Sequence, residues 1–172
     1  MTTVAQLRKA ALALPEVAET THFGMLAFAV RGRTFASLTE EGLVQLQLAD
    51  ADAEAAVGSQ PGAERLVRMG TPIGVRVPLA EVNGKDLNAL VRQAWAHRAP
   101  KRLAASLASV DAGEIPADCD LPREIGRPAL RALLGAGIIT LADAAQRSRD
   151  ELLALHGVGP KAMRILDESL ER

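Results

Sequence analysis

The sequence predicts an α+β fold in two parts. Between residues 26 and 79, several short runs alternate apolar and polar residues as half-buried strands do, and apolar positions at helical spacing lie on both sides of them. After about residue 122 every signal is helical, and pairs of glycines separate the apolar runs. We therefore expect a two-layer domain, with helices on one face of an antiparallel sheet, followed by a small all-α domain of paired helical hairpins. The expected boundaries are 1–108 for the first domain, 109–121 for a linker and 122–172 for the second domain.

The first predicted element is a helix that begins after Thr3 and ends before Pro15. The Thr3 side chain is suited to cap the first turn. The residues Val4, Leu7 and Ala11 then recur at helical spacing.

The strands follow as a meander. The runs "LAFAV" and "TFASLT" are separated by "RGR", which is a tight hairpin signal, and "LVQLQL" alternates strictly. This alternation is typical of antiparallel strands with one buried face. A short helix over "DADAEAAV", a strand over "IGVRVPL" and a closing helix over residues 83–99 complete the domain. The apolar face of the closing helix comprises Leu87, Leu90, Val91 and Trp95, and we expect Trp95 to lie in the core.

Composition excludes several classes of function. Hydrophobic residues make up 48% of the 172 and charged residues 24%, as in globular proteins, and no run approaches the length of a membrane span. Only 2% are aromatic, which argues against a surface that stacks bases. The single cysteine, Cys119, excludes an internal disulfide and a cysteine-based zinc site, and fits a reducing, cytoplasmic location. The net charge of −1 gives no global positive field, so any binding of nucleic acid must come from local geometry.

The first domain resembles a known family. The stretch "LALPEVAETTHFGMLAFAVRGRTFASL", the later "IGVRVPL" and the closing helix with its tryptophan are similar to the MmcQ/YjbR family of small bacterial proteins, over about residues 4 to 105. The resemblance implies a frataxin-like (CyaY-like) fold, in which helices flank one antiparallel sheet. It also brings the label of DNA binding that this family commonly carries.

A metal site and an active site are not predicted. Frataxins display carboxylates along the first helix, whereas this helix has no acid before Glu16. Glu16, Glu19 and His22 form an acidic group in an expected loop, where such side chains usually face solvent. No catalytic motif is present, and His22, His97 and His156 are scattered along the chain. We therefore expect no enzyme activity, no metal and no cofactor.

A basic cluster follows the closing helix. It comprises Arg92, Arg98, Lys101 and Arg102. These side chains are suited to phosphates, but cations at the C-terminal end of a helix also complement its dipole, and we favour this second interpretation.

The second domain contains an internal near-repeat. "LLGAGIIT" (133–140) aligns with "LHGVGPKA" (155–162) at a separation of 22 residues, so that Gly135 and Gly137 match Gly157 and Gly159. Each copy predicts a helix, a tight glycine hairpin and a second helix. Ser148 and Thr140 have the spacing of capping boxes for two of these helices, the former predicting a helix from about Arg149 to His156.

The second copy predicts an anion site. Pro160 suits the first position of a helix, whose N-terminal amides and dipole favour a phosphate, and Lys161 adds a positive charge. "LHGVGPKA" resembles the helix-hairpin-helix motif of DNA-repair proteins, and residues 123–172 resemble the C-terminal domain of the RNA polymerase α subunit. The resemblance implies contact with a duplex backbone. The residues expected to bind DNA are Gly157, Val158 and Gly159 through backbone groups, and Lys161, Arg164, Arg127 and Arg131 through side chains.

The first copy differs from this pattern, because Ile138 and Ile139 replace Pro160 and Lys161; we expect it to be structural. Pro128, with Arg127 beside it, occupies the position where the polymerase domain uses an arginine. Two functions are favoured, and a third, the binding of a metal or a small ligand on the sheet, has no ligand residues that the sequence can name. The first is weak, sequence-independent binding of double-stranded DNA by a non-enzymatic cytoplasmic protein that does not associate with membranes. The second is an adaptor whose helical domain docks onto another protein.

Overall fold

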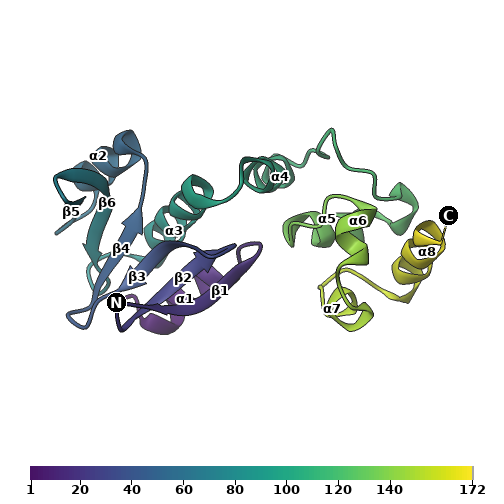
Figure 1. Cartoon of the computed structure of the whole chain (residues 1–172), viewed down its shortest axis with the longest axis horizontal. Coiled ribbons are helices and arrows are strands. Elements are labelled where there is room, and N and C mark those ends of the chain that lie inside the picture. Colours follow the sequence, from purple (N-terminus) through teal and green to yellow (C-terminus); the bar gives the residue numbers. More distant parts are fainter. Residues whose placement is uncertain (172) are drawn as a thin grey trace. The chain divides into compact units, whose positions relative to one another are not determined.

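The computed structural model of the chain describes residues 1–171 and divides it into two compact units, Met1–Pro100 and Lys101–Arg172 (Figure 1). The first unit is α+β, as predicted, and its six-stranded sheet is antiparallel throughout. Every described element of the second unit is helical. No helix within residues 1–171 is long and apolar enough to cross a bilayer.

The first unit contains three helices and six strands among its described residues. The strand order is β1-β2-β3-β4-β6-β5. The elements are α1 (Val4–Leu12), β1 (Val17–His22), β2 (Met25–Val30), β3 (Arg33–Leu38), β4 (Leu43–Gln47), α2 (Asp50–Ser59), β5 (Glu64–Arg68), β6 (Thr71–Pro78) and α3 (Gly84–Arg98).

The predicted helices and the four predicted strands of this unit are confirmed, but both edge strands were missed. β1 covers the segment that we expected to be a loop, so Glu19 and His22 lie on an edge strand. β5 pairs with β6 as a hairpin. Neither edge strand alternates cleanly between buried and exposed residues, and this explains why periodicity did not reveal them.

The core of the first unit lies between the sheet and the helices. Val44 and Leu46 of β4 are fully buried and alternate with the half-buried Gln45 and Gln47, so one face of the sheet is covered and the other is open. α3 packs on β3, β4 and α1. Trp95 is buried as predicted, and its indole N–H donates to the Pro15 carbonyl over 3.0 Å.

The second unit begins eight residues before the predicted linker. Its first helix, α4, runs through Lys101–Asp111, buries Leu103 and Leu107, and packs on α5. Lys101 and Arg102 therefore begin a new helix, and the interpretation that they complement the C-terminal end of the preceding helix is wrong for these two residues. The other elements are a 3-10 turn (Arg123–Ile125), α5 (Arg127–Gly135), α6 (Leu141–Ala145), α7 (Arg149–Leu153) and α8 (Pro160–Leu170).

The apolar faces of these helices form one core. Leu133, Met163 and Leu166 are almost fully buried at its centre. Both predicted capping boxes are present, with Thr140 capping α6 and Ser148 capping α7. α7 ends at Leu153, three residues before the predicted end, and Leu170 at the end of α8 is 39% exposed.

Candidate nucleic-acid interface

The second hairpin joins α7 to α8 through Gly157. This residue has φ +110°, which L side chains rarely adopt, and a Cβ atom placed on it would lie 2.8 Å from the Pro128 carbonyl oxygen of α5. Glycine is therefore required here both for the backbone conformation and for the close approach to α5. Val158 is 6% exposed and belongs to the core. Its N–H donates to the Leu155 carbonyl over 3.0 Å, so this amide, which we expected to face DNA, already has a partner.

The N-terminus of α8 is open. A Cβ atom on Gly159, which is the N-cap, would meet no atom within 4 Å. Pro160 occupies the first turn of the helix, as predicted. This turn contains no acidic residue, and no side chain caps the helix. The first backbone hydrogen bond of α8 runs from the Met163 N–H to the carbonyl of the N-cap, Gly159. The amides of Gly159, Lys161 and Ala162 precede it and have no acceptor within the helix.

The N-terminus of α5 has the same features and adjoins the second hairpin. Its N-cap is Gly126, which has φ +89°, and again the first turn has no acidic residue and no side-chain cap. A hollow of about 520 Å³ lies between this end of α5 and the hairpin. Its lining residues are Arg127, Pro128, Arg131, Ala132, His156 and Gly157. Two of the predicted cationic residues, Arg127 and Arg131, therefore lie beside the hairpin, and no acidic side chain lines this hollow.

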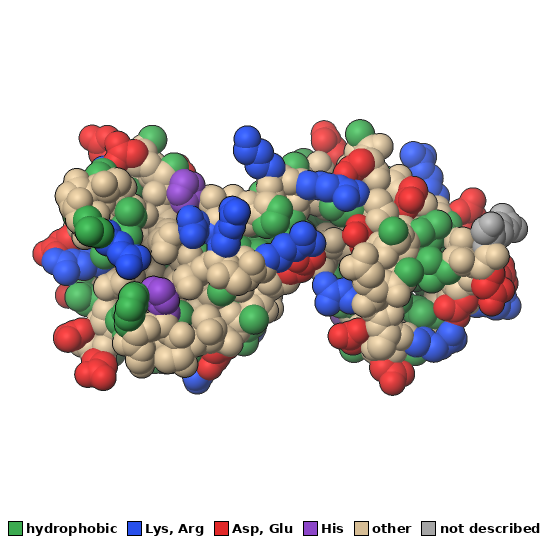
Figure 2. All heavy atoms as spheres, in the orientation of Figure 1, with side chains coloured by type: hydrophobic (Ala, Val, Ile, Leu, Met, Phe, Trp, Pro, Cys, Tyr) green, Lys and Arg blue, Asp and Glu red, His purple; other side chains and the backbone are tan. Residues whose placement is uncertain are grey.

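The four predicted cations differ in their availability. Among the described residues, no carboxylate forms an ion pair with Arg127, Arg131 or Lys161. Arg164 is different, because its Nε lies 3.7 Å from the Glu168 carboxylate one turn further along α8. Figure 2 shows basic and acidic side chains interspersed over the visible face of the second unit, so this face is not uniformly basic.

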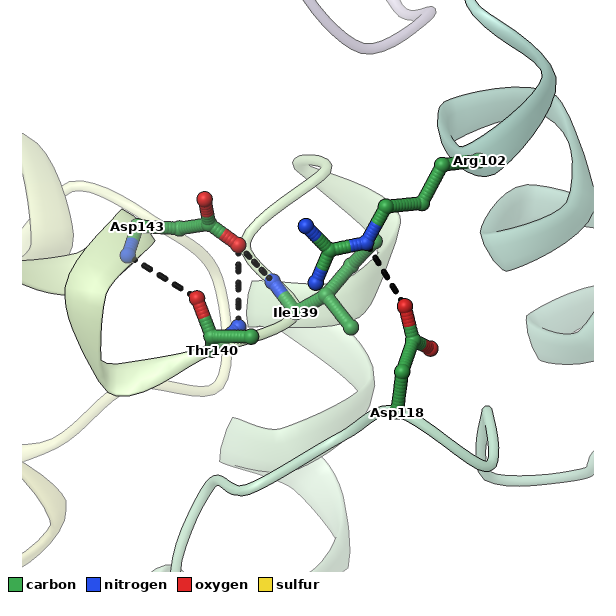
Figure 3. A network of polar contacts seen from close by, with 5 residues as sticks. All are labelled: Arg102, Asp118, Ile139, Thr140 and Asp143. Carbon is green, nitrogen blue, oxygen red and sulfur yellow. Dashed lines mark hydrogen bonds and ion pairs between the residues drawn. The ribbon is translucent and has the colours of Figure 1, made fainter.

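The first hairpin is closed by an acid. The Asp143 carboxylate accepts hydrogen bonds from the N–H groups of Ile139, at 3.1 Å, and Thr140, at 2.9 Å (Figure 3). Burial opposes ionisation of Asp143, but the bonds from the Thr140 side chain and from both amides outweigh it, so the pKa of Asp143 lies below its usual value. Gly137 has φ +79° and ends the turn after α5. The amides that would bind an anion in this copy are occupied, which supports the structural role predicted for it.

Figure 3 also shows an ion pair close to the first hairpin. The Arg102 Nε donates to the Asp118 carboxylate over 2.6 Å, and this contact raises the pKa of the Arg102 guanidinium. Arg102 is therefore engaged with a carboxylate of its own unit.

The acidic group of the first unit is paired with arginines. Glu19 accepts from the Arg8 guanidinium at 2.9 and 3.0 Å, and Glu16 pairs with Arg31. Within residues 1–171, no cluster of three or more histidine, cysteine, aspartate or glutamate side chains has the geometry of a metal site.

Sequence reasoning missed one residue of the interface, His156. It lies in the turn after α7 and lines the hollow beside Arg127 and Arg131. The sequence places His156 directly before Gly157, which could have indicated a role in the hairpin. Only the structure shows that it lines a hollow together with residues of α5.

The fold and the interface together define an α+β chain with an antiparallel sheet and a helical unit that has a cationic hollow. Family models, curated proteins and solved structures were compared with the chain, and none matches it. The resemblances to the MmcQ/YjbR family and to helix-hairpin-helix domains therefore remain predictions from the sequence.

Proposed function

We propose that this protein is a non-enzymatic, sequence-independent DNA-binding protein that contacts duplex phosphates through the second hairpin, residues 157–161, and through Arg127 and Arg131. The observation that carries the proposal is the uncapped N-terminus of α5 at an acid-free hollow that borders the second hairpin, which leads two residues later into the uncapped N-terminus of α8. α5 and α8 both have glycine as the N-cap, proline in the first turn and no acidic residue in that turn. Free amides and a positive dipole end favour a phosphate at each of them.

The finer features of the fold belong to the same proposal. We infer that the first unit has a frataxin-like (CyaY-like) arrangement and that the second is a paired helix-hairpin-helix domain. The support is the meander flanked by α1 and α3 in one unit, and the two glycine hairpins 22 residues apart in the other.

The proposal predicts a modest affinity. Lys161, Arg127 and Arg131 supply about three phosphate contacts, which correspond to a slope of roughly −2.7 in log K against log salt, or about a 40-fold loss of affinity for a fourfold rise in salt. Three contacts without base readout give sequence-independent binding.

The test is an anisotropy titration of a labelled duplex with the full chain at two salt concentrations. We expect Lys161→Gln, Arg127→Gln and Arg131→Gln each to lower the affinity and to reduce the salt slope by about one. Arg147→Gln is the matched control, because Arg147 is an exposed cation of the same unit that does not line the hollow. An equal effect of the control, or no binding at low salt by the folded wild-type chain, would contradict the proposal.

A second candidate function is docking onto another protein. It is favoured by an apolar hollow of about 390 Å³ in the second unit, whose lining includes Val110, Ile115, Leu130 and Leu134. Ile115 is 44% exposed there. Arg127 and Arg131 also line this hollow, so the substitution must be neutral: Ile115→Gln would weaken protein docking there and leave DNA binding unchanged.

A further inference from the structure

The open face of the sheet in the first unit is strongly curled. β1 and β5 are the two edge strands, and Phe23 and Arg68 lie at their ends. In a flat sheet these positions would be four to five strand spacings apart, roughly 19–24 Å. The Arg68 guanidinium instead lies 6.0 Å from the centre of the Phe23 ring. Both residues line one hollow, so the reach of the two long side chains and the curl of the sheet together close this span over the face that the helices leave uncovered.

Local backbone features accompany this curl. The register shifts between Leu66 and Val67 in β5, and also within β2. Gly74 of β6 lies so close to β4 that a Cβ atom on it would overlap the Leu46 carbonyl oxygen, at 1.9 Å. Only glycine permits this approach, so the curvature is fixed by the sequence.

The curl encloses a hollow of about 230 Å³ with a polar floor. Ser37 and Gln45 are paired across β3 and β4, and Gln47 lies two residues further along the same face. The Ser37 hydroxyl is 5% exposed and makes one long hydrogen bond, 3.4 Å, to the Gln45 Oε1 atom. This bond leaves the Gln45 amide nitrogen available as a donor, and the side chains of Gln45 and Gln47 both line the hollow.

The charge of the hollow is positive. Arg68 lines it, and no acidic side chain does. No carboxylate among the described residues pairs with Arg68, whereas Arg76, on the next strand, donates to Glu64 over 2.8 Å. A planar guanidinium without a partner is suited to bind a carboxylate through two hydrogen bonds.

The rim of the hollow is apolar, aromatic and exposed. Phe23, which lines the hollow, is 78% exposed with φ +50°; Met69, which follows Arg68 but does not line the hollow, is 98% exposed with φ +52°. Such turns usually hold asparagine or aspartate before the glycine, because a bulky side chain in the left-handed region is unfavourable by about 1–2 kcal/mol. Neither side chain gains burial in return. Arg31 adopts the same conformation before Gly32, so the backbone follows from the turn type; the exposed Phe23 ring, which contacts His22 and Arg68 beside the hollow, is the feature that suits a ligand.

We propose that this hollow binds a small planar carboxylate, with Arg68 holding the carboxylate and Phe23 covering the flat body of the ligand. The amides of Gln45 and Gln47 then supply hydrogen bonds to polar atoms of the ligand. The volume lies below the usual range of sites for drug-sized molecules, about 300–1,000 Å³, so the ligand is a single-ring compound. The site lies in the first unit and is independent of the proposed contact with DNA.

The test is an NMR titration of the ¹⁵N-labelled full chain with benzoate, 4-hydroxybenzoate and nicotinate at millimolar concentration. We expect shifts of the Ser37, Gln45 and Gln47 amides. Nicotinamide is the matched probe without a negative charge, and it should bind more weakly than nicotinate.

Two variants and a control separate the contributions. Arg68→Gln should weaken nicotinate by about tenfold or more, since it removes a charged hydrogen-bond donor, and should leave nicotinamide unchanged. Phe23→Ala should weaken both probes. Arg33→Gln, an exposed arginine at another turn of the sheet, should change neither. No shift with any of the three carboxylates, or equal binding of nicotinate by the wild type and by Arg68→Gln, would overturn the proposal.

Discussion

Replacing Gly157 with alanine tests the reasoning about the second hairpin most directly. The sequence makes Gly157 and Gly159 equivalent members of one motif, but their surroundings differ. Alanine at φ +110° costs about 1–2 kcal/mol in backbone strain, and relieving a 2.8 Å contact with a backbone oxygen costs about 1–3 kcal/mol more. We expect Gly157→Ala to lower the free energy of unfolding of the second unit by about 2–5 kcal/mol.

Gly159→Ala is the matched control. This residue has φ −100° and open space around its Cβ position, so the only loss is that alanine is a poorer N-cap than glycine, at most about 1 kcal/mol. The two substitutions change the same atoms at two positions of one turn. Their difference therefore isolates the contact with Pro128 and the left-handed backbone.

Hydrogen exchange of the α5 and α8 amides in urea measures the stability of the second unit. The fluorescence of Trp95 provides an internal control, because this residue is buried in the first unit and should report an unchanged transition. Equal losses of stability in the two variants, or a loss below about 1 kcal/mol for Gly157→Ala, would refute the packing of the hairpin against α5.

Two further predictions concern caps and pH. Gly159→Ser supplies a cap to α8, so it should raise the stability of the second unit by about 0.3 kcal/mol while weakening DNA binding, because the hydroxyl occupies the amides that bind phosphate; urea unfolding and anisotropy, measured together, check the opposite signs. Asp143 has a lowered pKa in the folded state, so its stabilisation is fully present above the unfolded pKa, about 4, and is lost as the pH falls through the folded pKa. Asp143→Asn should remove this part of the acid dependence, as measured by urea unfolding between about pH 6 and pH 3; an unchanged pH profile would show that its bonds to Ile139 and Thr140 contribute nothing.

Local signals predicted much of the fold correctly. Thr3, Thr140 and Ser148 each form the capping box that their spacing indicates, because a cap depends only on residues within one turn. The alternation in 43–48 and the helical face that contains Trp95 were sufficient for β4 and α3.

The elements that were missed depend on partners distant in sequence. β1 and β5 are edge strands whose side chains are mostly exposed, so their strand character comes from backbone pairing with β2 and β6 and leaves little pattern. α4 was missed because its sequence continues directly from the closing helix through Pro100 into the acidic stretch that we interpreted as a linker.

The candidate site was predicted by residue type but not by geometry. Lys161, Arg127 and Arg131 were named from the sequence, and the structure places the two arginines in one hollow beside the hairpin. The sequence could not distinguish the amide of Val158, which bonds to Leu155, from the open amides of the next turn. It also gave no sign of the hollow on the sheet, since the approach of Phe23 and Arg68 results from curvature accumulated over six strands.

The two copies of the hairpin explain why one is the stronger candidate for an anion. A helix N-terminus with glycine in place of a capping side chain gives up about 0.3 kcal/mol of stability, and α6 and α7 avoid this loss with Thr140 and Ser148. The first copy uses Asp143 to occupy its hairpin amides. α5 and α8 have no such group, although serine or aspartate at Gly159 would meet no obstruction. In the proposed function, a duplex phosphate would supply the missing acceptor at these two helix ends, and Arg127, Arg131 and Lys161 would be the cations that hold it there.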